Sequence, residues 1–430
     1  MELKSITISG YRNIYNTTIS FNDLTSILSL NNYGKSNLLA SIVFGLSFLQ
    51  QHPKIKQNMM DDVKCIPNLK RMNNTTFSFT LDGEAIFEGE KCLISYSFAF
   101  NWASSINSSK GKVIYELLKI KNDSQVATKY IIRENNSVLY KPSRMGRCTS
   151  NISIENNELA INKLFAFDNL FYNSLLKEIQ NVNVYIDRHF DTNFGYGITF
   201  MSEQELTDLT LKPEINIPKT LYRIKKNHKD KFALLVNVFT SLFPSIKDLC
   251  VYETSALVAP QMQTQPDNLF QSFSDKYYLL FVEDKNINAP INFLAMSDGA
   301  KRILLLLTFV VLAELNNYDL ICIEEPENSI HPGLLRKFLY TISELAGNTK
   351  LLFSSHSPYL INYMQPENIY LGLPNQNGVA TFKKLKTNTN AIKRLIKNIQ
   401  SSNMQLGDYL FDLLISSNNE DIDELSSYVE

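Results

Sequence analysis

The tripeptide Gly34-Lys35-Ser36 stands between an apolar run at 24–30, which suits a buried strand, and a helical pattern over 36–49. In a phosphate-binding loop, backbone N–H groups surround the phosphates, the lysine reaches the outer phosphates and the hydroxyl binds magnesium. The full pattern, G-x-x-x-x-G-K-[ST], needs a first glycine, but Ser29 occupies that position. The alternative is an ordinary turn into a helix, and the strand–loop–helix context favours the phosphate loop.

Two carboxylates, Glu324 and Glu325, follow the apolar run 320–323, which is typical of a buried strand. Phosphoryl transfer needs mainly positioning and neutralisation of charge. Glu324 would then hold hydrated magnesium, and Glu325 would orient and deprotonate an attacking water. The alternative is a strand that ends in solvated acids.

Two further motifs combine hydroxyl groups with a helix start or a strand end. Ser297-Asp298-Gly299 opens the apolar helical stretch 300–315, where a hydroxyl and a glycine N–H can bind an anion. An N-cap serine is the alternative. His356 lies in Ser-His-Ser-Pro after a predicted strand at 350–354, where its imidazole can hydrogen-bond a γ-phosphate or serve a structural role. His331 precedes Pro332, and we expect it to have a capping or packing role.

The elements that must position these residues change in character along the chain. Residues 2–9 and 18–21 alternate like a strand pair, and strand-like runs separated by turn residues from 77 to 140 predict an antiparallel sheet beside the first buried strand. Helical spacing covers 157–182 and 203–247, with a short strand predicted at 182–186. The last third alternates strands (277–283, 320–324, 350–354) with helices (300–315, 333–345), which predicts a parallel sheet. The acidic end, 420–430, is expected to be exposed.

Composition narrows the functional class. The 430 residues carry a net charge of −1, which excludes a protein that holds nucleic acid by overall charge alone. The five cysteines are scattered and form no C-x-x-C pair, which argues against a disulfide framework and a structural zinc site. The N-terminus lacks a signal-peptide pattern, and the longest apolar run is about half of the ~20 residues that a membrane crossing needs. We therefore expect a cytoplasmic protein with no membrane partner.

Taken together, the motifs resemble a known family. The order of the motifs is similar to that in the ABC-type ATPase head of SMC and RecF proteins. In this order, Glu-Glu-Pro-Glu-Asn-x-x-His-Pro lies between the Ser-Asp-Gly motif, which corresponds to the signature of these heads, and the Ser-His-Ser-Pro motif. The closest resemblance is to the OLD-type ATPases of anti-phage systems such as Septu or PARIS. The segment Gly10-Tyr11-Arg12-Asn13-Ile14 also matches the opening of these heads. The resemblance implies an α/β fold: an SMC-like head with a RecA-like parallel-sheet lobe, an antiparallel β lobe and a helical insertion.

The resemblance also implies roles for particular residues. ATP and Mg2+ would be the ligands, with the nucleotide held between two subunits. Nucleotide binding would involve Arg12, Asn31, Asn32, Gly34, Lys35, Ser36 and Asn37. Ser36 and Glu324 would hold the metal, Glu325 and His356 would be catalytic, and Ser297, Asp298 and Gly299 would reach the nucleotide from the opposite chain. Ser29 and Glu324, which replace the family's usual glycine and aspartate, suggest slow hydrolysis.

Three segments follow as predicted domains: 1–150 as the N-terminal ATPase lobe, 151–270 as a helical insertion, and 271–430 as the C-terminal ATPase lobe. Arg188, after the strand at 182–186, is a phosphate-sensor or salt-bridge candidate. Two basic stretches, 219–231 and 383–397, are candidates for DNA contact or for solvated helix faces, and the first is the better candidate.

The leading hypothesis is an ATPase that forms a homo-oligomer around ATP and controls a separate effector in anti-phage defence. The effector is expected to be a nuclease, because no nuclease motif is evident in this chain. The alternatives are a RecF-like DNA-repair ATPase and a nucleotide-bound scaffold that does not hydrolyse ATP.

Overall fold

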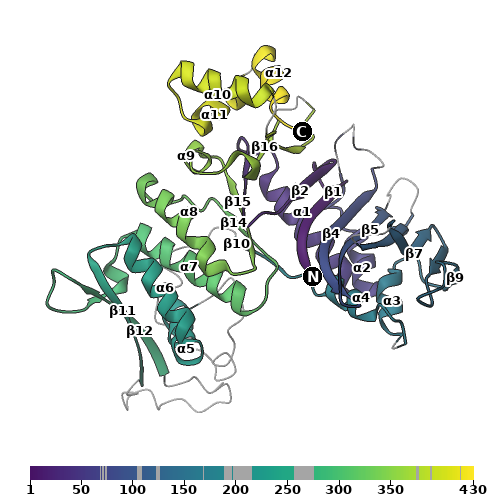
Figure 1. Ribbon diagram of the computed structural model, residues 1–430, viewed down its shortest axis with the longest axis horizontal. Coiled ribbons are helices and arrows are strands. Elements are labelled where there is room, and N and C mark those ends of the chain that lie inside the picture. The colour runs from purple at the N-terminus through teal and green to yellow at the C-terminus, as the bar shows by residue number, and fades with distance from the viewer. Residues whose placement is uncertain are drawn as a thin grey trace, which may run out of the picture. The chain divides into compact units, whose positions relative to one another are not determined.

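The computed structural model shows a mixed α/β protein that divides into two compact units (Figure 1). Unit 1 comprises 1–186 and 350–430, and unit 2 comprises 187–349. The structure describes all residues except 68, 70, 71, 73, 74, 104–108, 123–125, 168, 188–195, 197–215, 256–275, 374–376, 388, 389 and 417. Arg188 and all of 203–215 therefore lie outside the described residues. The boundaries of the three predicted domains differ from those of these two units, and the domains stay a prediction.

Unit 1 contains an eight-stranded antiparallel sheet in the order β2-β1-β4-β5-β6-β7-β8-β9. Its strands are β1 (Glu2–Ser9), β2 (Thr17–Ser20), β4 (Phe77–Phe87), β5 (Glu90–Asn101), β6 (Lys112–Asn122), β7 (Thr128–Glu134), β8 (Ser137–Tyr140) and β9 (Ser150–Asn151). In β4 and β5 every second residue is buried, because successive side chains of a strand point to opposite faces. The predicted antiparallel sheet is confirmed.

A second group of strands in unit 1 follows the order β15-β3-β16-β17. The strands are β3 (Leu24–Leu28), β15 (Lys350–Ser355), β16 (Ile369–Gly372) and β17 (Phe382–Lys384). Both β15 and β16 run parallel to β3, whereas β17 is antiparallel to β16. The parallel pairing of β15 with β3 confirms the prediction of a parallel sheet. The strand predicted at 277–283 does not belong to it: it is β12 (Lys276–Asp284), which pairs antiparallel with β11 (Ile246–Ser255) and β13 (Ile291–Asn292), because its described neighbours along the chain are strands rather than helices.

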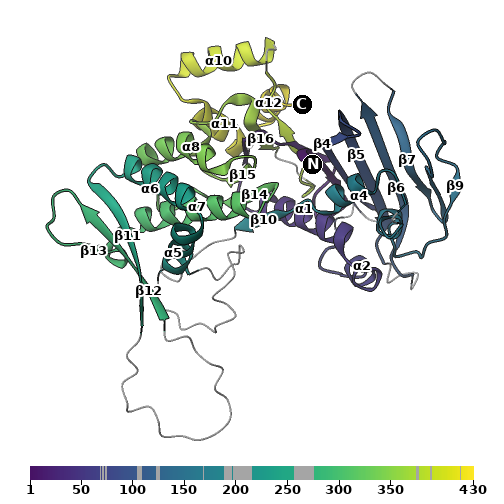
Figure 2. The same ribbon diagram turned by 60° about the horizontal axis from the view of Figure 1, so that its bottom comes forward.

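Helix α1 (Lys35–Gln50) fills the core of unit 1, and Figure 2 shows it with α4 on one side of the antiparallel sheet. Its Phe44 and Phe48 contact the inner face of the sheet, with ring centroids 5.2 Å from Phe77 and 4.7 Å from Phe100. Gly45 permits this approach, since a Cβ there would lie 2.1 Å from the ring of Phe79. The remaining helices of unit 1 are α2 (Pro53–Met60), α3 (Ala160–Phe165), α4 (Asn173–Gln180), α9 (Pro358–Ile361), α10 (Asn390–Ser402), α11 (Leu406–Ile415) and α12 (Asn419–Ser427).

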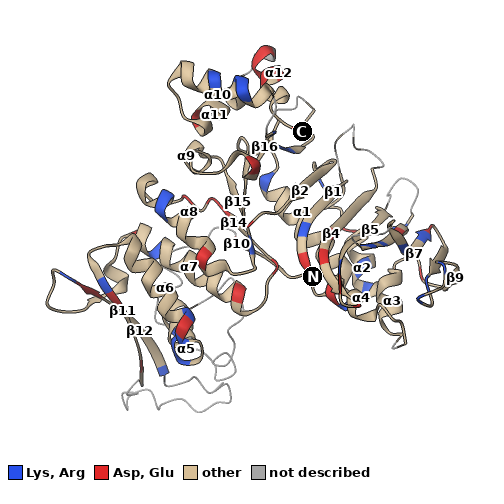
Figure 3. Ribbon diagram, in the orientation of Figure 1, with Lys and Arg blue, Asp and Glu red and all other residues tan. Residues whose placement is uncertain are grey.

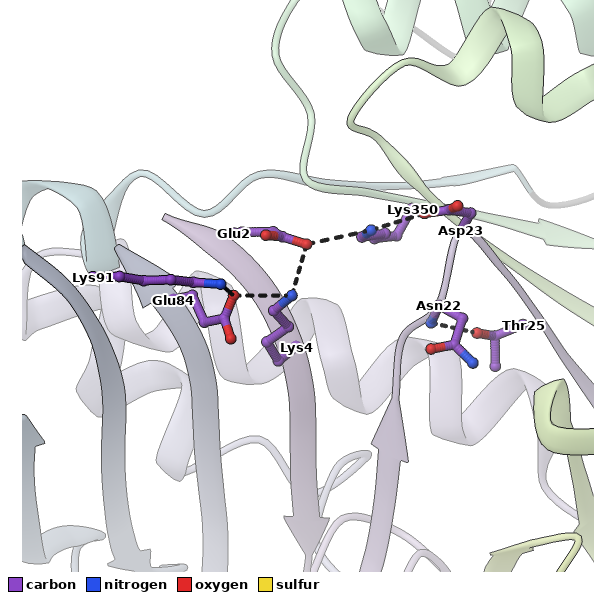
Figure 4. Close-up of polar contacts among 8 residues, drawn as sticks. All are labelled: Glu2, Lys4, Asn22, Asp23, Thr25, Glu84, Lys91 and Lys350. Atoms are coloured by element: carbon purple, nitrogen blue, oxygen red, sulfur yellow. Dashed lines mark hydrogen bonds and ion pairs between the residues drawn. The ribbon is translucent and has the colours of Figure 1, made fainter. Parts of the chain in front are cut away.

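A partly exposed cluster of charged residues joins the two sheets of unit 1 (Figure 4). Its members are Glu2, Lys4, Asp23, Glu84, Lys91 and Lys350. Lys350 pairs with Asp23 at 3.0 Å and with Glu2 at 3.5 Å, while Lys4 pairs with Glu2 at 2.8 Å. The hydrogen bond from Lys4 is the main cause of the lowered pKa of Glu2. Each exposed pair contributes at most about 1 kcal/mol, so the cluster fixes orientation more than stability.

In the described part of unit 2, four α-helices pack with a separate three-stranded antiparallel sheet, β11-β12-β13. The elements are α5 (Ile217–Asn227), α6 (Lys229–Leu242), β11 (Ile246–Ser255), β12 (Lys276–Asp284), β13 (Ile291–Asn292), α7 (Asp298–Leu315), β14 (Leu320–Glu324) and α8 (Pro332–Ala346). Helix α7 is buried along nearly its whole length, as its apolar sequence predicts. Strand β10 (Val184–Asp187) spans the boundary between the units.

The expectation of an exposed acidic end is confirmed for Glu420, Asp423 and Glu430, whose side chains are exposed, but not for the whole segment. Residues 419–427 form α12, in which Leu425 is buried, and Tyr428 and Val429 after it are also buried. All five cysteines are free thiols. Among the described residues no helix is long and apolar enough to cross a membrane.

Candidate functional site

The loop between β3 and α1 has the backbone of a tight, anion-accommodating turn. Gly34 has a φ of 135°, and Asn32 has a φ of 61°, which asparagine tolerates better than most residues. A Cβ on Gly34 would lie 3.0 Å from the Cβ of Ala380 and 3.1 Å from the Asn13 amide. No side chain caps the start of α1, so its first N–H groups are not satisfied by a capping side chain. These groups and Lys35 fit an anionic phosphate.

Ser29 replaces the expected first glycine without left-handed strain. It is fully buried and is absent from the positive-φ positions, so an L-residue adopts its backbone freely. Gly372 of β16 lies against it, since a Cβ on Gly372 would be 2.5 Å from the Ser29 Cβ and 2.7 Å from the Tyr33 ring. The side chain at position 29 therefore finds room because the neighbouring strand has a glycine, Gly372, beside it.

Lys35 bends back over its own loop. Its ammonium donates hydrogen bonds to the carbonyl oxygens of Ser29 at 2.9 Å and Leu30 at 3.2 Å. Burial raises the pKa of the Tyr33 phenol, which donates to the carbonyl of Thr381 at 3.4 Å. The loop is thus held by its own lysine on one side and by the segment before β17 on the other.

The turn after β1 reaches the same place. Arg12, which has a φ of 50°, donates from Nη1 to Oδ1 of Asn37 at 2.9 Å. Asn13 accepts from Nδ2 of Asn37 at 2.8 Å and donates to the carbonyl of Tyr33 at 2.9 Å. The predicted Arg12 and Asn37 are therefore brought together. Asn13 was missed as a site residue, although its position beside Arg12 in the segment 10–14 was the available signal.

The predicted histidine lies at the end of the strand next to the loop. Ser355 is in register with Leu28, and the N–H of Ser29 donates to the carbonyl of Ser355 at 3.5 Å. His356 follows directly. The hydroxyl of Ser355 accepts from the N–H of Ser357 at 2.8 Å, which tightens this turn. Since β3 and β15 are parallel, both motifs emerge at one edge of the sheet, where parallel α/β sheets bind ligands.

In unit 2, the Ser-Asp-Gly motif begins α7. Ser297 is the N-cap, and its hydroxyl accepts from the N–H of Ala300 at 3.3 Å, so the capping role considered for it is confirmed. Lys301 pairs with Asp298 at 3.6 Å. A Cβ on Gly299 would lie 2.8 Å from the carbonyl oxygen of Ser329. The motif therefore lies directly against the loop that follows the two glutamates.

The two glutamates have different surroundings. Glu324 ends β14 and is 7% exposed, whereas Glu325 leaves the strand with a φ of 49°. Asn328 donates from Nδ2 to Oε2 of Glu325 at 2.8 Å, and its N–H donates to the Glu325 carbonyl at 3.1 Å. The expected role of His331 is confirmed, because its Nδ1 accepts from Gly333 N–H at 3.2 Å as the N-cap of α8.

The predicted residues thus fall into two sets. Unit 1 holds Arg12, Asn31, Asn32, Gly34, Lys35, Ser36, Asn37 and His356, and unit 2 holds Ser297, Asp298, Gly299, Glu324 and Glu325. In unit 1 the contacts join Arg12 to Asn37 and the loop to the turn at His356, and in unit 2 they join Gly299 to the loop after Glu325. No group of three or more metal-ligating His, Cys, Asp or Glu side chains occurs in the part of the chain that the structure describes.

The two basic stretches differ in exposure. In the first, Lys219 is buried and Lys231 pairs with Glu314 at 2.9 Å, so not all of its cations face solvent. In the second, α10 presents Lys393, Arg394 and Lys397 at exposed positions (Figure 3). Each stretch therefore has three exposed cations close together, since Lys225, Lys226 and Lys229 of the first are also exposed.

Comparison with solved structures gives similarity to SMC head domains at low identity. The SMC head domain from Thermotoga maritima is 12% identical, with a TM-score of 0.41, over 90% of this chain and 100% of that chain. An SmcHead bound to the C-winged helix domain of ScpA is 12% identical, with a TM-score of 0.43, over 91% and 100%. An Smc head bound to the C-terminal domain of ScpA derived from Pyrococcus furiosus is 10% identical, with a TM-score of 0.41, over 94% and 99%.

Comparison with curated proteins gives no match. In contrast, residues 30–362 match the family described as "AAA domain, putative AbiEii toxin, Type IV TA system". The matched region runs from the phosphate-loop candidate to the segment just after His356, and so includes nearly all of the candidate site. The chain belongs to this AAA-domain family.

Proposed function

We propose that the protein binds and hydrolyses ATP with Mg2+, and that two copies pair around the nucleotide as ABC-type heads do. One observation carries the proposal. The Gly34–Ser36 loop and the Ser355–His356 turn end two adjacent parallel strands at one sheet edge, with the Lys35 ammonium above the loop. Membership of an AAA-domain family supports a nucleotide as the ligand.

In unit 1, the residues of the loop bind the phosphates. The N–H groups that begin α1 donate to phosphate oxygens, aided by the positive end of the helix dipole. Lys35 exchanges its carbonyl partners at 29 and 30 for phosphate oxygens, which are stronger acceptors because they are charged. Arg12 holds Asn37 in the first turn of α1, and His356 donates or accepts at the outer phosphate.

In unit 2, the residues after β14 act on the attacking water. The Ser36 hydroxyl of unit 1 and the Glu324 carboxylate of unit 2 are each a candidate ligand for Mg2+, which would neutralise charge that develops on the phosphates. Glu325 takes the proton of the water, and Asn328 fixes its carboxylate by the hydrogen bond to Oε2. Ser297 and Gly299 at the start of α7 bind the outer phosphate of a nucleotide held by the other copy.

Pairing of this kind would make the protein a switch that controls a second protein. We infer that the paired, ATP-bound form holds or releases a separate effector, a nuclease, in defence against phage. The family description, which names a toxin of a toxin–antitoxin system, is consistent with a chain that acts together with a second gene product. The test is phage challenge of cells that express the chain with its neighbouring genes, in which Lys35→Ala and Glu325→Gln should both abolish protection.

The biochemical test combines light scattering with phosphate release on the purified protein, with and without Mg2+ and ATP. Lys35→Ala should lose ATP-dependent assembly. Glu325→Gln should bind ATP, accumulate the assembled form and hydrolyse roughly 10²-fold or more slowly, which is the usual contribution of a general base. Lys54→Ala, which removes an exposed cation of α2, is the matched control and should behave as wild type. A wild type that binds no ATP, or variants that all match it, would refute the proposal.

A further inference from the structure

A buried arginine in unit 2 links three segments of the candidate site. Arg302 lies one turn into α7 and is only 4% exposed. Its Nη1 is 3.4 Å from Oδ2 of Asp187, which is itself 2% exposed at the end of β10. Its Nη2 donates to the carbonyl oxygen of Glu324 at 3.5 Å. Since uncompensated buried charge is costly, a guanidinium kept here needs a reason beyond packing.

The carbonyl that Arg302 contacts precedes an unusual backbone position. Glu325 has a φ of 49°, and a left-handed backbone at a residue other than glycine persists only where the surroundings fix it. On the far side of Glu325, Asn328 binds both its carbonyl and its carboxylate. On the near side, Arg302 binds the carbonyl of Glu324. The turn that aims the proposed base is thus held from both ends.

The same arginine belongs to the helix that carries the Ser-Asp-Gly motif. Gly299 lies three residues before it and packs against Ser329, whose carbonyl would be 2.8 Å from an added Cβ. Ser329 has a φ of 65° and belongs to the loop that begins at Glu325. Helix α7 therefore touches this loop at two points, once through the backbone at 299 and once through the side chain at 302. Displacement of the start of α7 would be transmitted to the glutamates.

We propose that Arg302 is a positioning residue: it fixes the left-handed turn at Glu325 and makes this turn move with the Ser297–Gly299 motif. The proposal rests on the proposed ATPase function, because Glu325 is taken as the base. If Arg302 has this role, a nucleotide held by the other copy would act on Glu325 of this copy. The nucleotide would contact the start of α7, and α7 would set the geometry of the Glu325 turn. Asp187 serves to balance the charge of the guanidinium and to orient it.

The experiment measures the order of the loop at 325–331 separately from the rate of ATP hydrolysis. Because breaking one half of a buried ion pair can unfold a protein, the main variant is Arg302→Met combined with Asp187→Leu, which removes both charges together. Arg302→Lys, which keeps the charge but places all its donors on a single nitrogen, is the conservative variant. Arg336→Met makes the same exchange at an exposed position of α8 and is the control. Hydrogen exchange of the amides at 325–331 is measured without nucleotide, and ATP affinity and single-turnover hydrolysis are measured on the same proteins.

The double variant should exchange the amides at 325–331 faster and hydrolyse roughly 10- to 100-fold more slowly, while its ATP affinity stays within about twofold of wild type. Arg302→Lys should fall between wild type and the double variant, and Arg336→Met should match wild type. If the double variant exchanged these amides and hydrolysed ATP as fast as wild type, the positioning role of Arg302 would be overturned. The proposed ATPase function would not be affected by that result. A wild type that binds no ATP would overturn the proposed function, whereas the exchange result would still decide whether Arg302 holds the loop.

Discussion

Lys56 offers a quantitative test of the packing of unit 1. It lies in α2, is fully buried, and its ammonium donates to Oδ1 of Asn162 at 2.5 Å. Burial lowers its pKa from 10.5 to about 8, although the charges of Glu116 and Glu158 oppose the change. We expect Lys56→Met, which keeps the length of the side chain and removes the charge, to make the protein more stable at pH 7.

The magnitude follows from the pKa. The difference between 10.5 and about 8, at about 1.36 kcal/mol per pH unit, means that holding Lys56 protonated in the fold costs about 3 kcal/mol. Methionine avoids this cost but leaves the Asn162 oxygen without its donor, which costs about 1–2 kcal/mol. The net gain at pH 7 is therefore about 1–2 kcal/mol.

The sign depends on pH. Between about 8 and 10.5 the unfolded chain binds the proton more tightly than the folded one, so wild-type stability rises with pH over this interval. The advantage of Lys56→Met should shrink over the same interval and reverse near its upper end. Urea unfolding at pH 7 and at pH 9.5, followed by the fluorescence of the single tryptophan, Trp102, reports on unit 1 directly because Trp102 is buried there.

The control is Lys54→Met, which makes the same exchange at an exposed position of α2 and should change stability little at either pH. A Lys56→Met variant that is less stable than wild type at pH 7, with a difference that does not vary with pH, would refute the reasoning. It would show that the buried ammonium is fully compensated by its partners.

Further predictions concern close contacts of glycines and a buried carboxylate. Gly372→Ala should cost about 1–3 kcal/mol of unfolding free energy in urea titrations and weaken ATP binding, and adding Ser29→Gly should restore part of both, because the two side chains compete for the same space. Equal defects in the single and double variants would contradict this. Gly299→Ala should abolish ATP-dependent assembly in light scattering while leaving the fold intact by circular dichroism, since its Cβ meets the carbonyl of Ser329; unchanged assembly would argue against contact at this turn. Glu116→Ala should destabilise by about 3–5 kcal/mol in thermal unfolding, because the buried carboxylate accepts from three donors, and a loss below 1 kcal/mol would show that water replaces it.

Local patterns were sufficient for the elements that carry the motifs. The apolar stretch from 300 to 315 and the strand at 320–324 are confirmed as α7 and β14 nearly to the residue, because a fully buried element has an uninterrupted apolar sequence. The parallel sheet was predicted from the alternation of strands with helices, and β15 running parallel to β3 confirms it. The register between Leu28 and Ser355 places the ends of β3 and β15 at one edge of the sheet, which no single motif indicated.

The contacts that complete the site could not be predicted, because they join residues far apart in the chain. Gly372 makes room for Ser29 across more than three hundred residues, and nothing near either position signals it. Arg302 and Asp187 are likewise distant in sequence. A charged residue in an apolar helix gives no indication of its role until its partner is known. At the end of the chain, acidic residues obscured the apolar positions Leu425, Tyr428 and Val429, whose spacing was the available signal for a packed helix.

The position of β3 between two parallel partners has a practical consequence for anyone who expresses part of this protein. The family match covers 30–362, which omits β3 before the loop and β16 after His356. A recombinant fragment with those bounds would leave the amides and carbonyls of Leu351–Ser355 unpaired on the side that β3 occupies, and an open strand of this kind recruits other chains. Such a fragment should aggregate, and it would lack the Ser29 carbonyl that Lys35 binds. The region recognised by sequence is thus smaller than the region that folds.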